Sequence, residues 1–134
     1  MLCRALGFAT SAAASDYAGT ISACRRAHGL PVVKLDSKLS ALARKQAQAM
    51  AASNSISHSA AGFFPTRIGP LKRKLAAENI GAGFLGFAEM LKQWEESRGH
   101  RENLSIKGAR RVGVAYADNA KSPYRKFWAI VITD

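Results

Sequence analysis

The stretch Trp94–Asn103, "WEESRGHREN", decides how the sequence is divided, because a helical pattern reaches into it and stops there. Apolar residues before the break recur at the spacing of one helix face: Phe87, Met90, Leu91 and Trp94. Gly99 favours the end of a helix, so we expect a helix over 87–97 that Gly99 closes. His100 follows at once, and it is one of only three histidines in the chain. The pattern predicts that the helix stops in order to direct His100 toward a site.

Two further stretches carry residues that suit the same site. "SISHSAAG", Ser55–Gly62, places His58 in a loop after a helix, and "AAENIGAGF", Ala76–Phe84, places Glu78 near a strand or turn. Its apolar neighbours draw Glu78 toward the core, where a carboxylate needs an arginine, a histidine or a metal ion as partner. Two neutral imidazoles and a carboxylate suffice for a divalent metal with open positions, and equally for general acid–base chemistry.

Each of these residues also has a simpler interpretation when taken alone. His58 can make a single loop hydrogen bond, and Glu78 can be a surface carboxylate or a helix-cap partner. His100 can stabilise a helix end, where a cation interacts with the negative pole. The spacing matches no local metal motif such as H-E-x-x-H. The hypothesis of a shared site therefore depends on the three stretches meeting in space.

The rest of the sequence predicts an α+β fold with helices packed on an antiparallel sheet. Helical spacing over 16–28 ends at Gly29, and a short extended link follows. The clearest helix begins at Asp36 or Ser37 and frays within 51–57, whereas 59–75 is irregular. Two strands of β-branched and aromatic character close the chain, at 111–118 and 125–133, with turn residues between them.

Composition indicates a single domain with a basic surface. The 134 residues contain 20 Lys+Arg and 9 Asp+Glu, a formal net charge of +11, which favours anionic partners. The basic residues are dispersed in short groups, which we interpret as solvated: Arg25–Arg26, Lys72–Lys74, Arg110–Arg111 and Arg125–Lys126. No nucleic-acid motif accompanies them, so nucleic acid is an unlikely partner. No segment has the length of a transmembrane helix.

The two cysteines and the first residues give weaker signals. Cys3 and Cys24 are too few for a disulfide framework, and Cys24 is expected to be a buried apolar group in its helix. Residues 1–15, "MLCRALGFATSAAAS", resemble a leader or the remnant of an export signal, although they lack a long apolar core. We therefore divide the chain into a leader at 1–15 and one domain at 16–134.

Several segments, in order along the chain, resemble the CAP superfamily of cysteine-rich secretory proteins, venom antigens and plant pathogenesis-related proteins. The similar segments are "HGLPVVKLDSKLSALARKQAQAMA" (28–51), "ISHS" (56–59), "AENIG" (77–81), "WEESRGHRENL" (94–104), "RRVGVAYA" (110–117) and "KFWAIVIT" (126–133). The chain is most similar to the short, cysteine-poor bacterial branch, called SCP-like. The resemblance implies an α-β-α sandwich with an antiparallel sheet between helical layers.

The resemblance also implies a cleft that contains His58, Glu78 and His100. In the family the histidines are associated with zinc or another divalent ion, and larger members have a second glutamate at the position of Ser97. Its absence here puts a mechanism with two carboxylates in doubt. Other residues near the cleft have simpler roles: Asn79 and Asn103 are expected to tie loops together, and Arg98 and Arg101 to be solvated or to hold an anion at the rim.

Three functions remain open from the sequence. The first is a secreted or cell-envelope binding module, extracellular or periplasmic, whose cleft holds a divalent metal and a lipid-like, sterol-like or anionic ligand, including an envelope polymer. The second is a metal-dependent, peptidase-like hydrolase with Glu78 as base. The third is non-specific binding of polyanions or nucleic acid, supported by charge alone.

Overall fold

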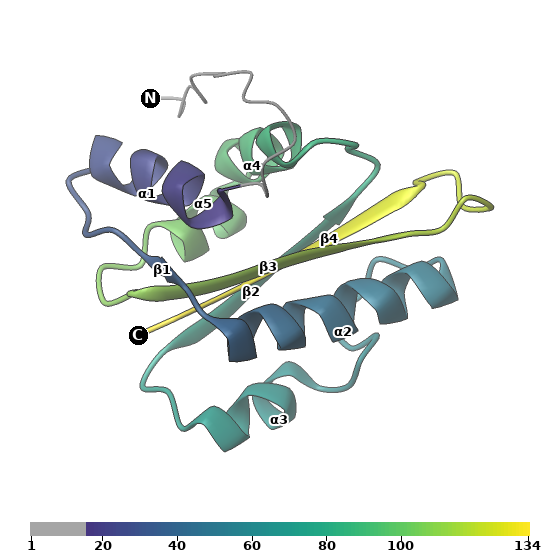
Figure 1. Ribbon diagram of the computed structural model, residues 1–134, viewed down its shortest axis with the longest axis horizontal. Helices are drawn as coiled ribbons and strands as arrows, with labels where there is room; N and C mark the ends of the chain where they lie inside the picture. The colour runs from purple at the N-terminus through teal and green to yellow at the C-terminus, as the bar shows by residue number, and fades with distance from the viewer. Residues whose placement is uncertain (1–15) are drawn as a thin grey trace.

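The structure, a computed structural model, describes residues 16–134, so the predicted leader at 1–15 lies outside the described residues. The elements follow one another as shown in Figure 1: α1 (Tyr17–Ala27), β1 (Lys34–Leu35), α2 (Ser37–Ser53), α3 (Phe64–Ile68), a 3₁₀ turn (Gly69–Leu71), β2 (Ala76–Ala82), α4 (Phe87–Glu96), α5 (Arg98–Leu104), β3 (Arg111–Asp118) and β4 (Lys126–Thr133). The helices at 17–27, 37–53 and 87–96 and the two closing strands confirm the predicted elements.

The sheet has the strand order β1-β3-β4-β2, which leaves β1 and β2 at opposite edges. β4 pairs antiparallel with β3, as predicted, and also antiparallel with β2. β1 pairs parallel with β3, so the sheet is mixed rather than wholly antiparallel. The sequence showed this strand only as an extended link, because two residues are too few to show an alternating pattern.

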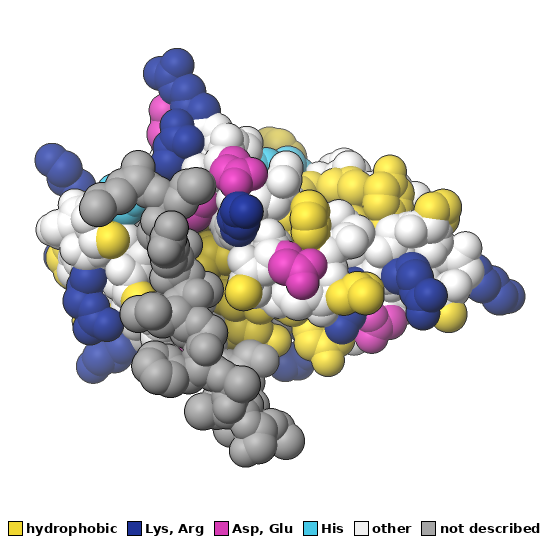
Figure 2. Space-filling view, turned by 90° about the horizontal axis from the view of Figure 1, so that it is seen from above, with side chains coloured by type: hydrophobic (Ala, Val, Ile, Leu, Met, Phe, Trp, Pro, Cys, Tyr) yellow, Lys and Arg dark blue, Asp and Glu magenta, His cyan; other side chains and the backbone are white. Residues whose placement is uncertain are grey.

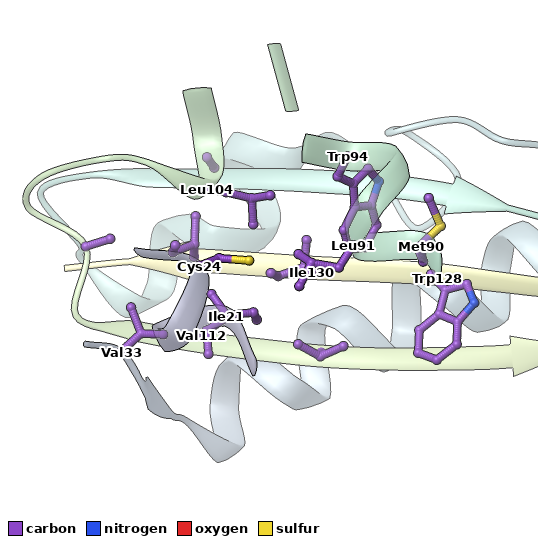
Figure 3. Close-up of a cluster of buried hydrophobic side chains, with 14 residues drawn as sticks. Ile21, Cys24, Val33, Met90, Leu91, Trp94, Leu104, Val112, Trp128 and Ile130 are labelled. Carbon is purple, nitrogen blue, oxygen red and sulfur yellow. The ribbon is translucent and has the colours of Figure 1, made fainter. Parts of the chain in front are cut away.

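Helices cover both faces of the sheet, which confirms the predicted α-β-α sandwich. Figure 1 shows α1, α4 and α5 on one face and α2 and α3 on the other. Successive side chains of a strand point to opposite faces, and buried β4 residues join two separate clusters accordingly. Trp128, Ile130 and Ile132 pack in the first cluster, with Phe127, Ala129 and Val131 in the second. Figure 3 shows the first cluster, where Cys24 of α1 is buried as expected.

Two helical segments differ from the sequence-based expectation. The region predicted to be irregular contains α3, which has Pro65 in its first turn; five residues are too few for a periodic signal. Gly99 does not end the preceding helix. α4 ends at Glu96, and Ser97, with extended φ −102° and ψ 121°, separates it from α5. Gly99 therefore lies inside α5, and His100 belongs to the same short helix.

α2 lies so close to β3 that Gly113 cannot carry a side chain. A Cβ built on Gly113 would overlap the backbone of Leu39 and Ser40 in α2. Gly113→Ala is therefore expected to lower the free energy of unfolding by about 3 kcal/mol, because two packed backbones would have to separate. Urea denaturation followed by circular dichroism measures the loss.

Gly99→Ala is the matched control, because a Cβ on Gly99 meets no described atom within 4 Å. Within a helix this change is expected to be neutral or to stabilise by up to about 1 kcal/mol. Equal stability of the two variants would show that α2 can move away from β3 at little cost.

Candidate functional site

The edge strand β2 carries the centre of the site and contacts both helical layers. Within β2, Ile80 packs in the cluster on the α2 side, whereas Ala77 packs in the cluster beneath α1 and α4. Alternation along the strand therefore places Glu78 on the α2–α3 side and Asn79 on the α4–α5 side. Because no further strand within residues 16–134 covers this edge, residues from both layers can meet beside it.

Glu78 is buried and fully occupied by two partners. Its side chain is 1% exposed, and its carboxylate receives both ends of the Arg67 guanidinium, Nη1 to Oε2 at 2.9 Å and Nη2 to Oε1 at 3.0 Å. Nδ1 of His58 lies 2.9 Å from Oε1. The prediction that a buried carboxylate here needs an arginine or a histidine is confirmed, since Glu78 has both.

Arg67 is the principal residue that the sequence analysis did not identify. It lies on α3, and its guanidinium also donates to the carbonyl oxygens of Gly62 and His58, each at 2.7 Å. One signal pointed to it: Arg67 is the only basic residue between His58 and Lys72. If Glu78 is buried against residues 59–71, Arg67 is the only cation of that segment that can pair with it.

Gln46 holds the His58 loop from the other side and was also missed. Its side chain is fully buried on α2. Nε2 donates to the carbonyl oxygen of Ser57 at 2.6 Å, and Oε1 accepts from the backbone N–H of Ala61 at 3.2 Å. Both ends of the loop around His58 are thus fixed to helices before any ligand binds.

The Glu78 contact determines the tautomer of His58. A carboxylate only accepts hydrogen bonds, so Nδ1 of His58 carries the proton. In the neutral ring the lone pair is then on Nε2. The side chain is 57% exposed, and this nitrogen is directed away from the carboxylate. A carboxylate that orients a histidine in this way is the usual support of a metal-binding or basic imidazole.

His100 approaches from the opposite layer, and two asparagines position its backbone. Nδ2 of Asn79 donates to the His100 carbonyl oxygen at 3.1 Å, and Nδ2 of Asn103 donates to Oδ1 of Asn79 at 2.9 Å. The two asparagines thus tie separate segments together, and their hydrogen bonds fix α5 to the edge strand.

The His100 ring has a buried nitrogen that lacks a partner. Among residues 16–134, nothing makes a hydrogen bond to its Nδ1, although that atom is inaccessible to solvent. Burial, and then the nearby His58, lower the pKa of His100 below its ordinary value. The ring therefore stays neutral at neutral pH and offers a lone pair.

The remaining predicted cleft residues lie at the break between α4 and α5 or make contacts within these two helices. Ser97 is half-buried at the break between α4 and α5, where its side chain makes no capping hydrogen bond. Arg98 is exposed and pairs with Glu102 at 3.1 Å, within its own helix. Nη1 of Arg101 donates to the Glu95 carbonyl oxygen at 3.0 Å. Both arginines are thus engaged with α4 and α5 rather than arranged around an anion.

Nitrogen atoms that could bind a metal ion are left on the histidines but not on the carboxylate. Within the described part of the chain, no three His, Cys, Asp or Glu side chains are placed to share an ion. Both Glu78 oxygens are directed at Arg67 and His58. Nε2 of His58 and the unpartnered ring of His100 are the available donors, and water would have to complete the coordination of an ion held between them.

An open, largely apolar pocket of 300 Å³ adjoins His58. Its apolar wall consists of Phe63, Phe64 and Pro65, and the hydroxyls of Ser57 and Ser59 lie at its polar side. Phe63 is 67% exposed, which is unusual for a large aromatic side chain. A ligand with an apolar portion could cover this surface while a polar group reaches His58.

The sandwich fold, with His58 and His100 beside its edge strand, is that of a known class, and the comparison of sequences agrees. The chain belongs to the cysteine-rich secretory protein family, CAP, whose pattern matches residues 18–132.

Two of the relatives are bacterial proteins of greater length. The uncharacterized protein YkwD of Bacillus subtilis (strain 168) is 31% identical in an alignment over 103 residues, with 71% of this chain and 38% of that protein covered. An extracellular protein containing a SCP domain from Bacillus anthracis str. Ames has a TM-score of 0.74 at 27% identity, over 87% of this chain and 38% of that one. The chain thus spans about two fifths of the length of both relatives.

A third likeness shows the fold alone. An outer surface protein from Borrelia burgdorferi has a TM-score of 0.75 at 18% identity, with 87% of each chain covered. In residues 16–134, no helix has the length and apolar character needed to cross a bilayer.

Proposed function

We propose that this CAP domain is a secreted or cell-envelope binding module whose cleft holds a divalent ion between His58 and His100. One observation carries the proposal: Glu78 directs Nε2 of His58 outward, and the ring of nearby His100 has a buried Nδ1 without a partner. The extracellular B. anthracis relative supports the location. The apolar pocket beside His58 supports a lipid-like ligand next to the ion.

Zinc titration by calorimetry, with untagged protein, tests the ion site. Wild type is expected to bind one zinc ion, and His58→Ala or His100→Ala to weaken binding at least about tenfold, because each removes one of two protein ligands. Glu78→Gln is expected to weaken it about 10- to 100-fold, because the support of His58 is altered. Affinity should fall as the pH is lowered, because only an unprotonated imidazole can bind the ion.

His28→Ala provides the matched control, since His28 is exposed at the end of α1. If His28→Ala weakens zinc binding as much as His58→Ala does, the ion binds at the surface rather than in the cleft.

Metal-dependent hydrolysis is the second candidate, favoured by the same oriented histidine. Glu78 is not available as the base, because its carboxylate is buried and its oxygens are engaged. Nε2 of His58 has one lone pair, so it would hold the ion, and an ion held there would lower the pKa of a bound water that acts as the nucleophile. The test is cleavage of a peptide library. Hydrolysis would be supported if chelation stops the cleavage, zinc restores it and His58→Ala abolishes it. Retention of a fluorescent fatty acid without turnover would support the binding module.

A further inference from the structure

A second concave surface lies at the opposite edge of the sheet from the histidine cleft. It is an open groove of 540 Å³ beside β1, lined by Pro31, Val32, Lys34, Arg110 and Arg111. β1 and β2 are the two outer strands of the sheet, so the sheet separates this groove from His58 and Glu78. We call it the β1 groove.

The strand pairing brings the three cations of the β1 groove together. Lys34 and Arg111 are register partners across the parallel pair, and the Lys34 N–H donates to the Arg110 carbonyl oxygen at 2.9 Å. Nη1 of Arg110 donates to the carbonyl oxygens of Lys107 and Ala109, at 2.9 and 2.8 Å. One edge of that guanidinium is held by the backbone, which fixes its position before a ligand arrives.

Acidic side chains do not neutralise the groove. Oδ2 of Asp36 lies 3.3 Å from Arg111 and 3.7 Å from Arg73, so one carboxylate serves two arginines. Neither Lys34 nor Arg110 forms an ion pair within the described residues. Burial, and then the positive charge of Arg110, lower the pKa of Arg25 below its ordinary value. Figure 2 shows Lys and Arg side chains at the left end of the molecule as well as elsewhere on this face.

The groove also has an apolar side. Val32 is 44% exposed within it, and neighbouring Leu35 on β1 is 56% exposed. A ligand that matches both features has a compact, multiply charged anionic group joined to an apolar portion. Lys34, Arg110 and Arg111, offset in part by Asp36, leave about two positive charges, which a phosphate monoester with about 1.5 to 2 negative charges at pH 7 balances. A carboxylate with a single charge does not.

We infer that the β1 groove binds a phosphate monoester, with Lys34, Arg110 and Arg111 around the phosphate and Val32 against the apolar portion. Guanidinium groups suit phosphate because their paired N–H donors match two of its oxygens. The site is independent of the histidine cleft, and its occupation requires no metal.

Calorimetry with phenyl phosphate at low ionic strength tests this site. Lys34→Gln/Arg110→Gln is expected to weaken binding about tenfold or more, because two charge-assisted contacts are lost. Arg111 is left intact, since it pairs with Asp36 at the start of α2. The matched control is Arg44→Gln/Lys45→Gln, which removes two exposed charges from α2 and preserves the groove. This control and His58→Ala/His100→Ala are both expected to bind within about twofold of wild type.

Vesicles distinguish the source of the phosphate. Sedimentation with phosphatidylcholine vesicles containing phosphatidic acid, in the same variants, shows whether the groove takes a lipid headgroup as well as a soluble ester. The inference is supported if Lys34→Gln/Arg110→Gln, and neither control variant, loses binding to phenyl phosphate or to the vesicles. Wild-type protein that binds neither probe, or equal weakening in the groove and control variants, would overturn it by assigning the effect to net charge.

Discussion

Glu78→Ala is expected to lower the free energy of unfolding by about 3 kcal/mol, because it leaves a buried arginine without its counter-charge. The Arg67 side chain is only 9% exposed, and without Glu78 it keeps hydrogen bonds to two carbonyl oxygens but no carboxylate. His58 loses its acceptor at the same time, so the loop is expected to become mobile. Urea denaturation measures the stability, and hydrogen exchange of the amides at 57–62 measures the mobility.

A double-mutant cycle separates the ion pair from other effects of the change. Arg67→Ala/Glu78→Ala removes both charges and is expected to be more stable than the sum of the single changes predicts, by about 1 kcal/mol or more. Glu96→Ala is the matched control, because Glu96 is exposed and pairs only with Lys92 at 3.9 Å. Its effect is expected to stay within about 0.5 kcal/mol. Strictly additive single changes would mean that Arg67 and Glu78 do not depend on each other.

Arg25→Met is expected to destabilise the protein by about 3 kcal/mol or more, since several carbonyl oxygens would lose their donor in the interior. Arg25 is 1% exposed. It donates to Pro31 at 2.8 Å and to Leu104, Ile106 and Ala109 at 2.9, 3.0 and 3.3 Å. The Leu104 carbonyl belongs to the negative end of α5, which favours a cation. Chemical denaturation again gives the measurement.

The neighbouring arginine provides the control. Arg26→Met changes an exposed side chain of the same helix and is expected to stay within about 0.5 kcal/mol of wild type. Arg25→Lys is expected to recover only part of the loss, because one ammonium cannot reach carbonyls arranged around a planar guanidinium. A full recovery by lysine would show that charge alone, and not the geometry of the guanidinium, satisfies this interior.

The sequence pattern predicted the helices and strands that are long enough to show a repeating spacing of apolar residues. Asp36 begins α2 as expected, with its side chain accepting from two backbone N–H groups, and β3 spans the predicted residues 111–118. The two-residue β1, the five-residue α3 and the single extended residue Ser97 gave no periodic signal. Resemblance to the CAP superfamily supplied the layered arrangement, because the order of helices and strands alone does not determine which helix covers which face.

Side-chain partners were the least predictable part, because chain folding and not local pattern brings them together. Arg25 was interpreted as one of a solvated basic pair, yet its acceptors at Leu104, Ile106 and Ala109 lie 79 to 84 residues away in sequence. Gln46 has the polarity of an exposed helical residue but is buried where the His58 loop crosses α2. Burial of Glu78 was predictable from its apolar neighbours; the identity of Arg67 as its partner required the structure.

The position of β2 also bears on aggregation. A seven-residue strand at the edge of a sheet normally exposes unpaired N–H and C=O groups to strands of other molecules. Here Nε1 of buried Trp94 donates to the Ile80 carbonyl oxygen at 3.0 Å. Arg67 and the His58 loop contact Glu78 on the same strand. Trp94, Arg67 and the His58 loop therefore also hinder strand addition, so selection for solubility would act in part on side chains that form the candidate cleft.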